Sequence, residues 1–211
     1  MAKPSLVTAN SISFGKNTAR YCLDELSYEP DFTKSSKEWF EYQRLAHPRR
    51  KAEYATIRKM KNGLFPNDHI EYANNGKPYL AESPLHISIS HSLNFGLFAF
   101  GPDRFGCDIE EPNERLNRVY AKFTSEIEIN TLKGLDRLDQ LCILWTCKEA
   151  IYKLMDRSGV DWKKDCQCVG GELPELTFRW NHGGESALVQ CYVIPYAHQA
   201  WISFAFKKTN G

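Results

Sequence analysis

DRLDQLCILWTCKEAIYKLMD, residues 136–156, is the stretch of this sequence with the clearest helical pattern. Its large apolar side chains recur at helical spacing, at Leu138, Leu141, Trp145, Tyr152 and Met155. A glycine, Gly159, lies just beyond its end. The pattern predicts one long helix, from about Asp136 to Asp156, in the second half of the chain.

Segments rich in β-forming residues lie on both sides of this helix. They are LHISISHS (85–92), NFGLFAFG (94–101) and FGCDIE (105–110) before it, and LTFRW (176–180), ALVQCYVIP (187–195) and AWISFAF (200–206) after it. Further helices are expected over 37–61, with a break or kink at Pro48, and over 125–133. Each half of the chain therefore offers helix and antiparallel strands, which predicts a mixed α+β fold of two similar subdomains.

A polar, proline-containing stretch, EEPNER (110–115), is expected to connect the two halves. We therefore expect an N-terminal subdomain over 1–110 and a C-terminal subdomain over 111–211.

The composition is that of a globular protein whose net charge is too small to create a strong electrostatic field. Of 211 residues 42% are apolar and 25% charged, and 27 basic against 26 acidic residues leave a net charge of +1. This balance argues against a nucleic-acid partner. The first sixteen residues lack the apolar core of a signal peptide, and no run approaches the roughly 20 apolar residues of a membrane span. We expect a cytoplasmic protein without a membrane span.

Seven cysteines are present, and most lie scattered inside apolar segments. That placement favours small buried thiols in a reducing compartment. Cys166 and Cys168 form a C-x-C pair, with His182 and Cys191 downstream, but this spacing matches no standard zinc pattern. Free thiols are the favoured interpretation.

The strand FGCDIEE (105–111) carries two carboxylates on one face. Side chains alternate along a strand, so Asp108 and Glu110 point the same way while Ile109 points the other. Like charges so placed repel unless one is protonated or a cation lies between them. Magnesium suits such a site, because it typically takes one or two carboxylates and substrate phosphate oxygens. An exposed acidic strand end is the alternative.

Within the long helix, WTCKEAIYK (145–153) places Trp145, Glu149 and Lys153 at i, i+4 spacing on one face. Lys148 lies about 100° round from Glu149. An aromatic ring, a carboxylate and an ammonium therefore follow one another along one face of the helix. The alternative is a surface Glu–Lys pair below a core tryptophan.

Two motifs and one basic run in the first half could contact an anion. SISHS (88–92) ends a strand with Ser90 and His91, and NNGKPYL (74–80) places Lys77 on a rigid turn. RLAHPRRKAEYATIRKMK (44–61) sets seven cations against the single acid Glu53, and they are Arg44, Arg49, Arg50, Lys51, Arg58, Lys59 and Lys61. This run predicts a local polyanion site, with a solvated helix face as the alternative.

Taken together, FGCDIEE, WTCKEAIYK, SISHS, NGKP and the RRKAEYATIR segment resemble the 4′-phosphopantetheinyl transferases of the surfactin-synthetase-activating type. The resemblance covers roughly Arg44 to Lys153, and its specific part is the ordered pair G-x-D-x-E and W-x-x-K-E-x-x-x-K. Cys107 stands where the family usually has isoleucine or valine. The last sixty residues carry no family signature.

The resemblance implies a pseudo-twofold monomer with the 4′-phosphopantetheinyl transferase fold, which binds coenzyme A between its halves. By position, Asp108, Glu110 and Glu149 would hold Mg²⁺ against the coenzyme A pyrophosphate, and Lys148 and Lys153 would bind phosphates. The nucleotide contacts would come from the first half, at Lys77, Ser90, His91 and one or more of Arg49, Arg50 and Arg58.

The implied reaction moves 4′-phosphopantetheine from coenzyme A to a serine of an acyl or peptidyl carrier protein, and the catalytic residues would be Glu149 and Lys153. Attack on the β-phosphorus builds negative charge that magnesium and Lys153 would neutralise, and Glu149, or a metal-bound water that it orients, would take the serine proton. Two rivals are a metal-dependent nuclease or phosphodiesterase and an inactive carrier-binding module. Near-neutral charge counts against the first, and the retained carboxylates count against the second.

Overall fold

A computed structural model describes residues 9–14, 17–33, 36–197 and 199–208 of this chain. The contacts divide the chain into two compact units, Met1–Asp103 and Arg104–Gly211. Each unit joins helices to an antiparallel sheet, so the expected α+β class is confirmed. The expectation of no signal peptide falls partly on residues 1–8, which lie outside the described residues.

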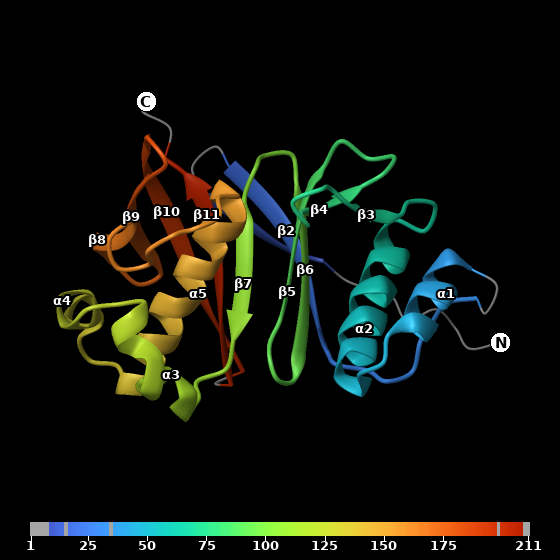
Figure 1. Cartoon of the computed structure of the whole chain (residues 1–211), viewed down its shortest axis with the longest axis horizontal. Coiled ribbons are helices and arrows are strands. Elements are labelled where there is room, and N and C mark those ends of the chain that lie inside the picture. The colour runs from blue at the N-terminus through green and yellow to red at the C-terminus, as the bar shows by residue number, and fades with distance from the viewer. Residues whose placement is uncertain (1–8, 15–16, 34–35, 198, 209–211) are drawn as a thin grey trace. The chain divides into compact units, whose positions relative to one another are not determined.

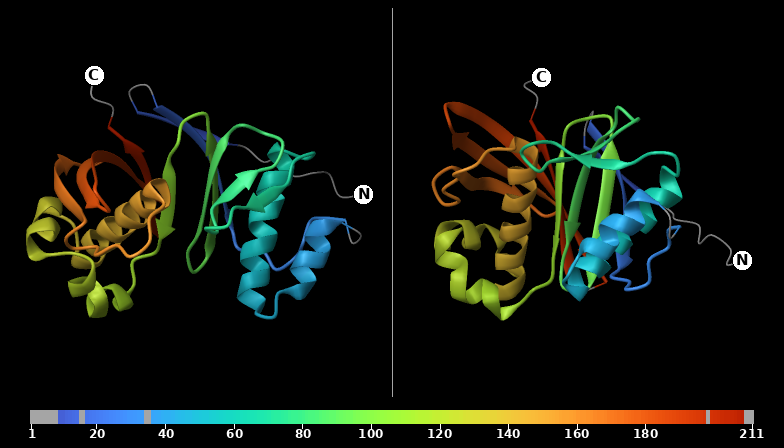
Figure 2. Two further views of the ribbon diagram at one scale, coloured as in Figure 1. Left: turned by 45° about the horizontal axis from the view of Figure 1, so that its top comes forward. Right: turned by 45° about the vertical axis from the view of Figure 1, so that its right-hand side comes forward.

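The first unit contains a four-stranded sheet, two helices and a short hairpin (Figure 1). Its elements are β1 (Asn10–Phe14), β2 (Asn17–Glu25), α1 (Lys37–Arg44), α2 (Pro48–Leu64), β3 (Ile70–Tyr72), β4 (Pro78–Leu80), β5 (His86–His91) and β6 (Phe95–Gly101). The sheet order is β1-β2-β6-β5, and β3 pairs only with β4. Helix α2 packs against β2 and β6, as both views of Figure 2 show.

The break expected at Pro48 separates two helices. Helix α1 ends at Arg44 and α2 begins at Pro48, where the missing N–H of proline costs no hydrogen bond. The His47 side chain caps α2, since its Nδ1 accepts from the Arg49 backbone N–H at 3.2 Å. The basic residues at the start of α2 are thereby held in a regular first turn.

The second unit is built from a five-stranded sheet and one long helix (Figure 1). Its elements are β7 (Gly106–Glu110), α3 (Glu114–Val119), η1 (Tyr120–Lys122), α4 (Glu126–Ile129), η2 (Asn130–Leu132), α5 (Arg137–Met155), β8 (Cys166–Glu172), β9 (Glu175–His182), β10 (Glu185–Tyr196) and β11 (Ala200–Lys207). Helices α3 and α4 contact α5 in the same unit. The long helix predicted over 136–156 and the three late strands are confirmed as α5, β9, β10 and β11.

The division between the units falls before β7, whereas the sequence analysis placed it after Glu110. Strand β7 pairs antiparallel with β11, with Asp108 opposite Ser203, at the edge of the order β7-β11-β10-β9-β8. Because its sheet partner is the last strand of the chain, β7 brings Asp108 and Glu110 into the second unit. The stretch after it is partly helical, since Asn113 caps α3.

Helix α5 lies directly against β7 because Gly106 leaves room for the helix backbone. A Cβ at Gly106 would sit 2.0 Å from the Ala150 carbonyl oxygen and 2.7 Å from the Leu154 backbone nitrogen. Another face of α5 is buried in a large apolar core with Phe178 and Trp180 of β9, while Tyr152 is exposed. The helix is therefore held in part by close backbone approach and in part by apolar packing.

We predict that Gly106→Ala destabilises the second unit by about 1–3 kcal/mol, because the new methyl group meets backbone atoms that cannot move independently. Urea denaturation followed by circular dichroism measures the change. Gly96→Ala is the matched control: its Cβ would meet the ends of the Thr56, Ile57 and Met60 side chains at 3.0–3.6 Å, which can adjust. An equal cost in both variants would contradict the close approach of α5 to β7.

Candidate functional site

Asp108 on β7 faces α5 and meets Lys153 there. The Lys153 Nζ donates to Asp108 Oδ1 at 2.7 Å and to the Cys107 carbonyl oxygen at 3.0 Å. Asp108 is only 6% exposed, and its neighbour Ile109, on the opposite face of the strand, is buried. The structure thus brings together one residue from each of the two motifs singled out in the sequence.

Lys153 keeps its positive charge in this setting. Burial lowers the pKa of its ammonium, but the Asp108 carboxylate, with smaller contributions from Cys107 and Glu149, outweighs burial and raises the pKa above its ordinary value. A positively charged Lys153 at neutral pH is what the binding of an anion requires.

Glu110 and Glu149 are held in an environment that disfavours their charge. Burial raises the pKa of Glu110 to about 7, with a further contribution from the Asp108 carboxylate. Burial likewise raises the pKa of Glu149 to about 7, where repulsion by Asp108 outweighs attraction by Lys153. Three carboxyl groups therefore influence one another, with one lysine to balance them.

These carboxyl groups fit a divalent cation by their chemistry, because magnesium prefers carboxylate oxygens and would relieve their mutual repulsion. Within the described residues, however, no three His, Cys, Asp or Glu side chains are gathered closely enough to form a metal site. Asp108 is paired with Lys153 instead. Magnesium binding by Asp108, Glu110 and Glu149 thus stays a prediction.

The start of α2 forms a second polar cluster, in the first unit. Glu53 accepts from Arg49 Nε at 3.0 Å and from Arg50 at 2.9 Å, and its carboxylate lies 3.3 Å from His91 Nδ1. Arg50 also lies 3.3 Å from His91 Nε2. Two adjoining recesses, of about 350 and 460 Å³, are lined by Arg50, Glu53 and His91. Three of the residues predicted to bind a polyanion, Arg49, Arg50 and His91, are thus gathered around Glu53, and the binding itself stays a prediction.

The remaining residues predicted to bind the nucleotide are placed differently. Arg58 lines the smaller recess but is 2% exposed, stacked 4.3 Å from the centre of the Tyr54 ring. Ser90 is buried, although the sequence suggested a residue open to solvent or a ligand. Lys77 follows the turn between β3 and β4, where its backbone N–H bonds to Asn75. Neither Ser90 nor Lys77 is among the described residues that line the two recesses.

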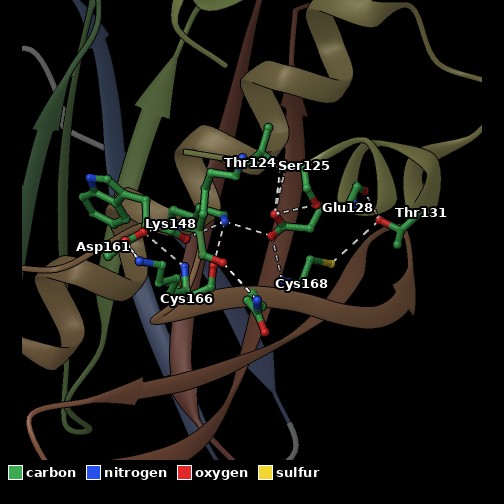
Figure 3. A network of polar contacts seen from close by, with 12 residues as sticks. Thr124, Ser125, Glu128, Thr131, Lys148, Asp161, Cys166 and Cys168 are labelled. Atoms are coloured by element: carbon green, nitrogen blue, oxygen red, sulfur yellow. Dashed lines mark hydrogen bonds and ion pairs between the residues drawn. The ribbon is translucent and has the colours of Figure 1, made fainter. Parts of the chain in front are cut away.

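Lys148 requires a correction, because the structure turns it away from any ligand. Its side chain is fully buried, and Nζ contacts Glu128 Oε1 at 2.8 Å, the Trp162 carbonyl oxygen at 3.0 Å and the Cys166 carbonyl oxygen at 2.6 Å (Figure 3). An ammonium has three N–H donors, so all three are occupied inside the unit. A phosphate contact by Lys148 is not available in this fold.

Trp145 belongs to an aromatic cluster and not to the face that meets β7. Its ring centre lies 5.0 Å from that of Phe123 and 5.9 Å from that of Trp162, and Trp162 lies 5.5 Å from Tyr152. Steps of four residues advance about 40° round a helix, so Trp145 and Lys153 are about 80° apart and can face different neighbours. The cluster was not foreseen, since Trp162 lies in a polar stretch without a periodic pattern.

Among the described residues, Cys166, Cys168, His182 and Cys191 are not gathered into a group that could hold a metal ion. All seven cysteines are buried free thiols. His182 lies 2.7 Å from Asp165, and its other ring nitrogen lies 3.0 Å from the Ser158 carbonyl oxygen. His182 thus serves to fasten the segment between α5 and β8.

Residues 104–201 match the family model of the 4′-phosphopantetheinyl transferase superfamily. The match covers most of the second unit, including both β7 and α5. It supports phosphopantetheine transfer in general and extends past Lys153, where the sequence showed no signature. No curated protein sequence matches the chain. None of the described helices is both long and apolar enough to cross a membrane.

We predict that the stability of the metal-free protein falls as the pH rises from about 4.5 to about 7. With folded-state pKa values of about 7 for Glu110 and Glu149, against the usual 4.5, the folded state binds more protons than the unfolded state in this window. The fall should level off above pH 7, when both states are deprotonated. Urea denaturation between pH 5 and pH 8, in the presence of a chelator, measures it.

Glu149→Gln should make this decline shallower and so gain stability over the wild type most clearly at pH 8, since the amide carries no charge to bury. Glu172→Gln on β8 is the control, because Glu172 is exposed and far along the sheet order from β7. A wild type of constant stability across this range, or a Glu149→Gln variant with the wild-type slope, would show that the pKa of Glu149 is not raised.

Proposed function

We propose that this protein is a 4′-phosphopantetheinyl transferase of the surfactin-synthetase-activating type. It would move 4′-phosphopantetheine from coenzyme A to a serine of an apo acyl or peptidyl carrier protein and release adenosine 3′,5′-bisphosphate. The observation that carries the proposal is that the superfamily match spans β7 and α5, and that Asp108 and Lys153 from these elements lie 2.7 Å apart. A cytoplasmic monomer is part of the same proposal.

In this proposal Lys153 stabilises charge on the reacting phosphate. The serine Oγ–P bond forms at the β-phosphorus while the bond from that phosphorus to the bridging oxygen breaks, so negative charge grows on the departing nucleotide. Lys153 stays protonated through its contact with Asp108 and can donate to a phosphate oxygen at that stage. One such contact is typically worth about 3 kcal/mol in the transition state.

Glu149 is the proposed acceptor of the serine proton. In the metal-free protein its pKa is raised to about 7, chiefly by burial, so that it is partly ionised at neutral pH and can accept a proton. Asp108, Glu110 and Glu149 are also the residues that would hold magnesium. The ion would supply positive charge against the phosphate oxygens of coenzyme A.

The first unit would bind the 3′-phosphate of the nucleotide at the start of α2. Arg50 is the strongest candidate, since it lines both recesses and its side chain is 65% exposed. His91 lines both recesses as well, Arg49 lines the larger one, and the buried Arg58 lines the smaller one. Lys77 and Ser90 would contact the rest of the nucleotide.

The rival nuclease uses similar groups, because paired carboxylates and a lysine also serve phosphodiester hydrolysis. The superfamily match favours phosphopantetheine transfer over hydrolysis. We therefore retain one proposed function.

We predict that incubation with coenzyme A, Mg²⁺ and a panel of apo carrier proteins adds the mass of phosphopantetheine to at least one carrier, as read by mass spectrometry. Asp108→Asn should abolish the addition, because it removes a metal ligand and the partner of Lys153. Lys153→Ala should lower turnover about 100-fold, which corresponds to the loss of one transition-state contact.

Exposed Lys164→Ala, which removes a lysine from the turn before β8, is the control and should transfer at the wild-type rate. Thermal unfolding should show that Asp108→Asn and Lys153→Ala remain folded. Full activity in folded Asp108→Asn would remove Asp108 from the site, and hydrolysis of single-stranded DNA with no transfer would favour the nuclease.

We predict that Arg50→Ala weakens the binding of coenzyme A about tenfold or more, because a charge-assisted contact to the 3′-phosphate is lost. The binding of 3′-dephospho-coenzyme A should barely change. Steady-state kinetics with both coenzyme forms, each against varied carrier protein, measure the preference. Lys59→Ala is the control on the same helix, since Lys59 pairs with Asp24 at 2.9 Å. A higher Michaelis constant for the carrier, with both coenzyme forms affected alike, would instead assign Arg50 to carrier docking.

A further inference from the structure

Glu128 and Lys148 form an ion pair that is almost completely withdrawn from water. Glu128 is 4% exposed and Lys148 is 0% exposed, with 2.8 Å between Oε1 and Nζ. Glu128 belongs to the short helix α4, where Ser125 caps the first turn and the Glu128 carboxylate accepts from the Ser125 backbone N–H. The sequence carries this S-x-x-E capping signal, but nothing in it indicates that the glutamate is also paired with Lys148.

The pair fastens four segments of the second unit to one another (Figure 3). Glu128 accepts from the Cys168 backbone N–H at 2.9 Å and from Thr124 Oγ1 at 3.1 Å. Lys148 donates to carbonyl oxygens of Trp162, in the loop after α5, and of Cys166, at the start of β8. Helices α4 and α5, the loop and β8 therefore share one network of directional bonds.

Helix α5 is bound along two stripes, one on each side of Glu149. Thr146 bonds to Ser203 of β11 at 2.8 Å, Ala150 approaches Gly106, and Lys153 bonds to Asp108, so this stripe faces the sheet. Lys148 lies on the other stripe, where it contacts Glu128 and the carbonyl oxygens of Trp162 and Cys166. Consecutive residues are about 100° apart round a helix, so turning α5 to release Lys148 would also displace Glu149 and Lys153.

Stability alone does not account for such a pair, because desolvation of two charges consumes most of their attraction, and apolar residues of similar volume are often as stable. Three directional bonds from one ammonium do what apolar packing cannot, since they fix a single rotation of the helix. The best-attested use of buried ion pairs and polar groups is the setting of register.

We propose that Glu128 and Lys148 are positioning residues, which fix the rotation of α5 and thereby hold Lys153 and Glu149 in place opposite Asp108. The consequence for catalysis rests on the proposed function. The placement of Lys153 against Asp108 does not, and it can be measured in the folded protein without any substrate.

The first test is a double-mutant cycle for the Asp108–Lys153 pair, with Asp108→Asn and Lys153→Met, measured by urea denaturation. In the wild-type background we expect a clear coupling between the two residues. In a Lys148→Met background we expect that coupling to be lost, because Lys153 no longer meets Asp108. Lys61→Met is the matched control: Lys61 is 1% exposed, lies 3.0 Å from Glu38 and donates to the Asp68 carbonyl oxygen at 2.6 Å, but in the first unit.

Lys61→Met should destabilise its own unit and leave the Asp108–Lys153 coupling unchanged. An undiminished coupling in the Lys148→Met background would overturn the proposal and reduce the pair to a local contribution to stability. Where Lys148→Met fails to fold, Glu128→Gln takes its place, since the amide oxygen still accepts from Cys168 while the charge on the partner of Lys148 is gone.

The second test is kinetic. Folded Lys148→Met or Glu128→Gln should lose about 100-fold in kcat, as expected for a misplaced catalytic group, with little change in the Michaelis constant for coenzyme A. A wild-type kcat in either folded variant, even with a lower melting temperature, would also overturn the proposal. A wild type that modifies no carrier would refute the proposed function, and the coupling experiment would still decide whether the pair positions Lys153.

Discussion

Helix α5 can approach β7 as closely as it does because Gly106 has no side chain, and the candidate site depends on that approach. One turn of the helix from this contact, Lys153 reaches Asp108 on the neighbouring part of the strand. The same closeness withdraws Glu110 and Glu149 from water and raises their pKa values. Position and electrostatics in the site thus have one geometric cause.

The arrangement favours chemistry at the expense of stability. A chain selected only to fold would not set three carboxyl groups against one lysine between a helix and a strand, because the uncompensated charges oppose burial. A proton on a glutamate relieves the repulsion, and so does a cation or a lysine. This repulsion supports the proposal that Asp108, Glu110 and Glu149 bind a cation, which stays a prediction.

Sequence reasoning recovered what depends on local pattern. It predicted α5 from its periodicity, the break at Pro48 and most of the strands, and it identified Asp108 and Lys153 before their contact was visible. It placed β7 in the wrong half, because only the pairing of β7 with β11, distant in sequence, assigns the strand to the second unit. Strands β1, β2, β3, β4 and β8 were not predicted, since their short or polar runs carry weak patterns.

The W-x-x-K-E-x-x-x-K motif shows a further limit of such reasoning. The family resemblance implied that Lys148 and Lys153 are both phosphate ligands, but the two lysines lie about 140° apart round the helix and meet opposite surroundings. The Lys153 side chain, 27% exposed, faces the buried Asp108 carboxylate, whereas Lys148 is fully buried in the core of its unit. Spacing predicts which residues share a face, and only tertiary packing decides which face is buried.

Each unit contains one lysine that is buried on its longest helix and paired with a glutamate of a shorter one. Lys61 of α2 pairs with Glu38 of α1 and reaches the Asp68 carbonyl oxygen, as Lys148 of α5 pairs with Glu128 of α4 and reaches two carbonyl oxygens of the following segment. In both cases the helix also carries candidate phosphate-binding residues, Arg49 and Arg50 on α2 and Lys153 on α5. A long, flexible, positively charged side chain binds a phosphate well only when the rotation of its helix is fixed. The end of the side chain lies farther from the helix axis than the backbone does, so a small rotation of the helix moves it farther. The directional bonds of Lys61 and Lys148 are suited to such fixation, whereas an apolar side chain of similar volume would pack as well without fixing a rotation.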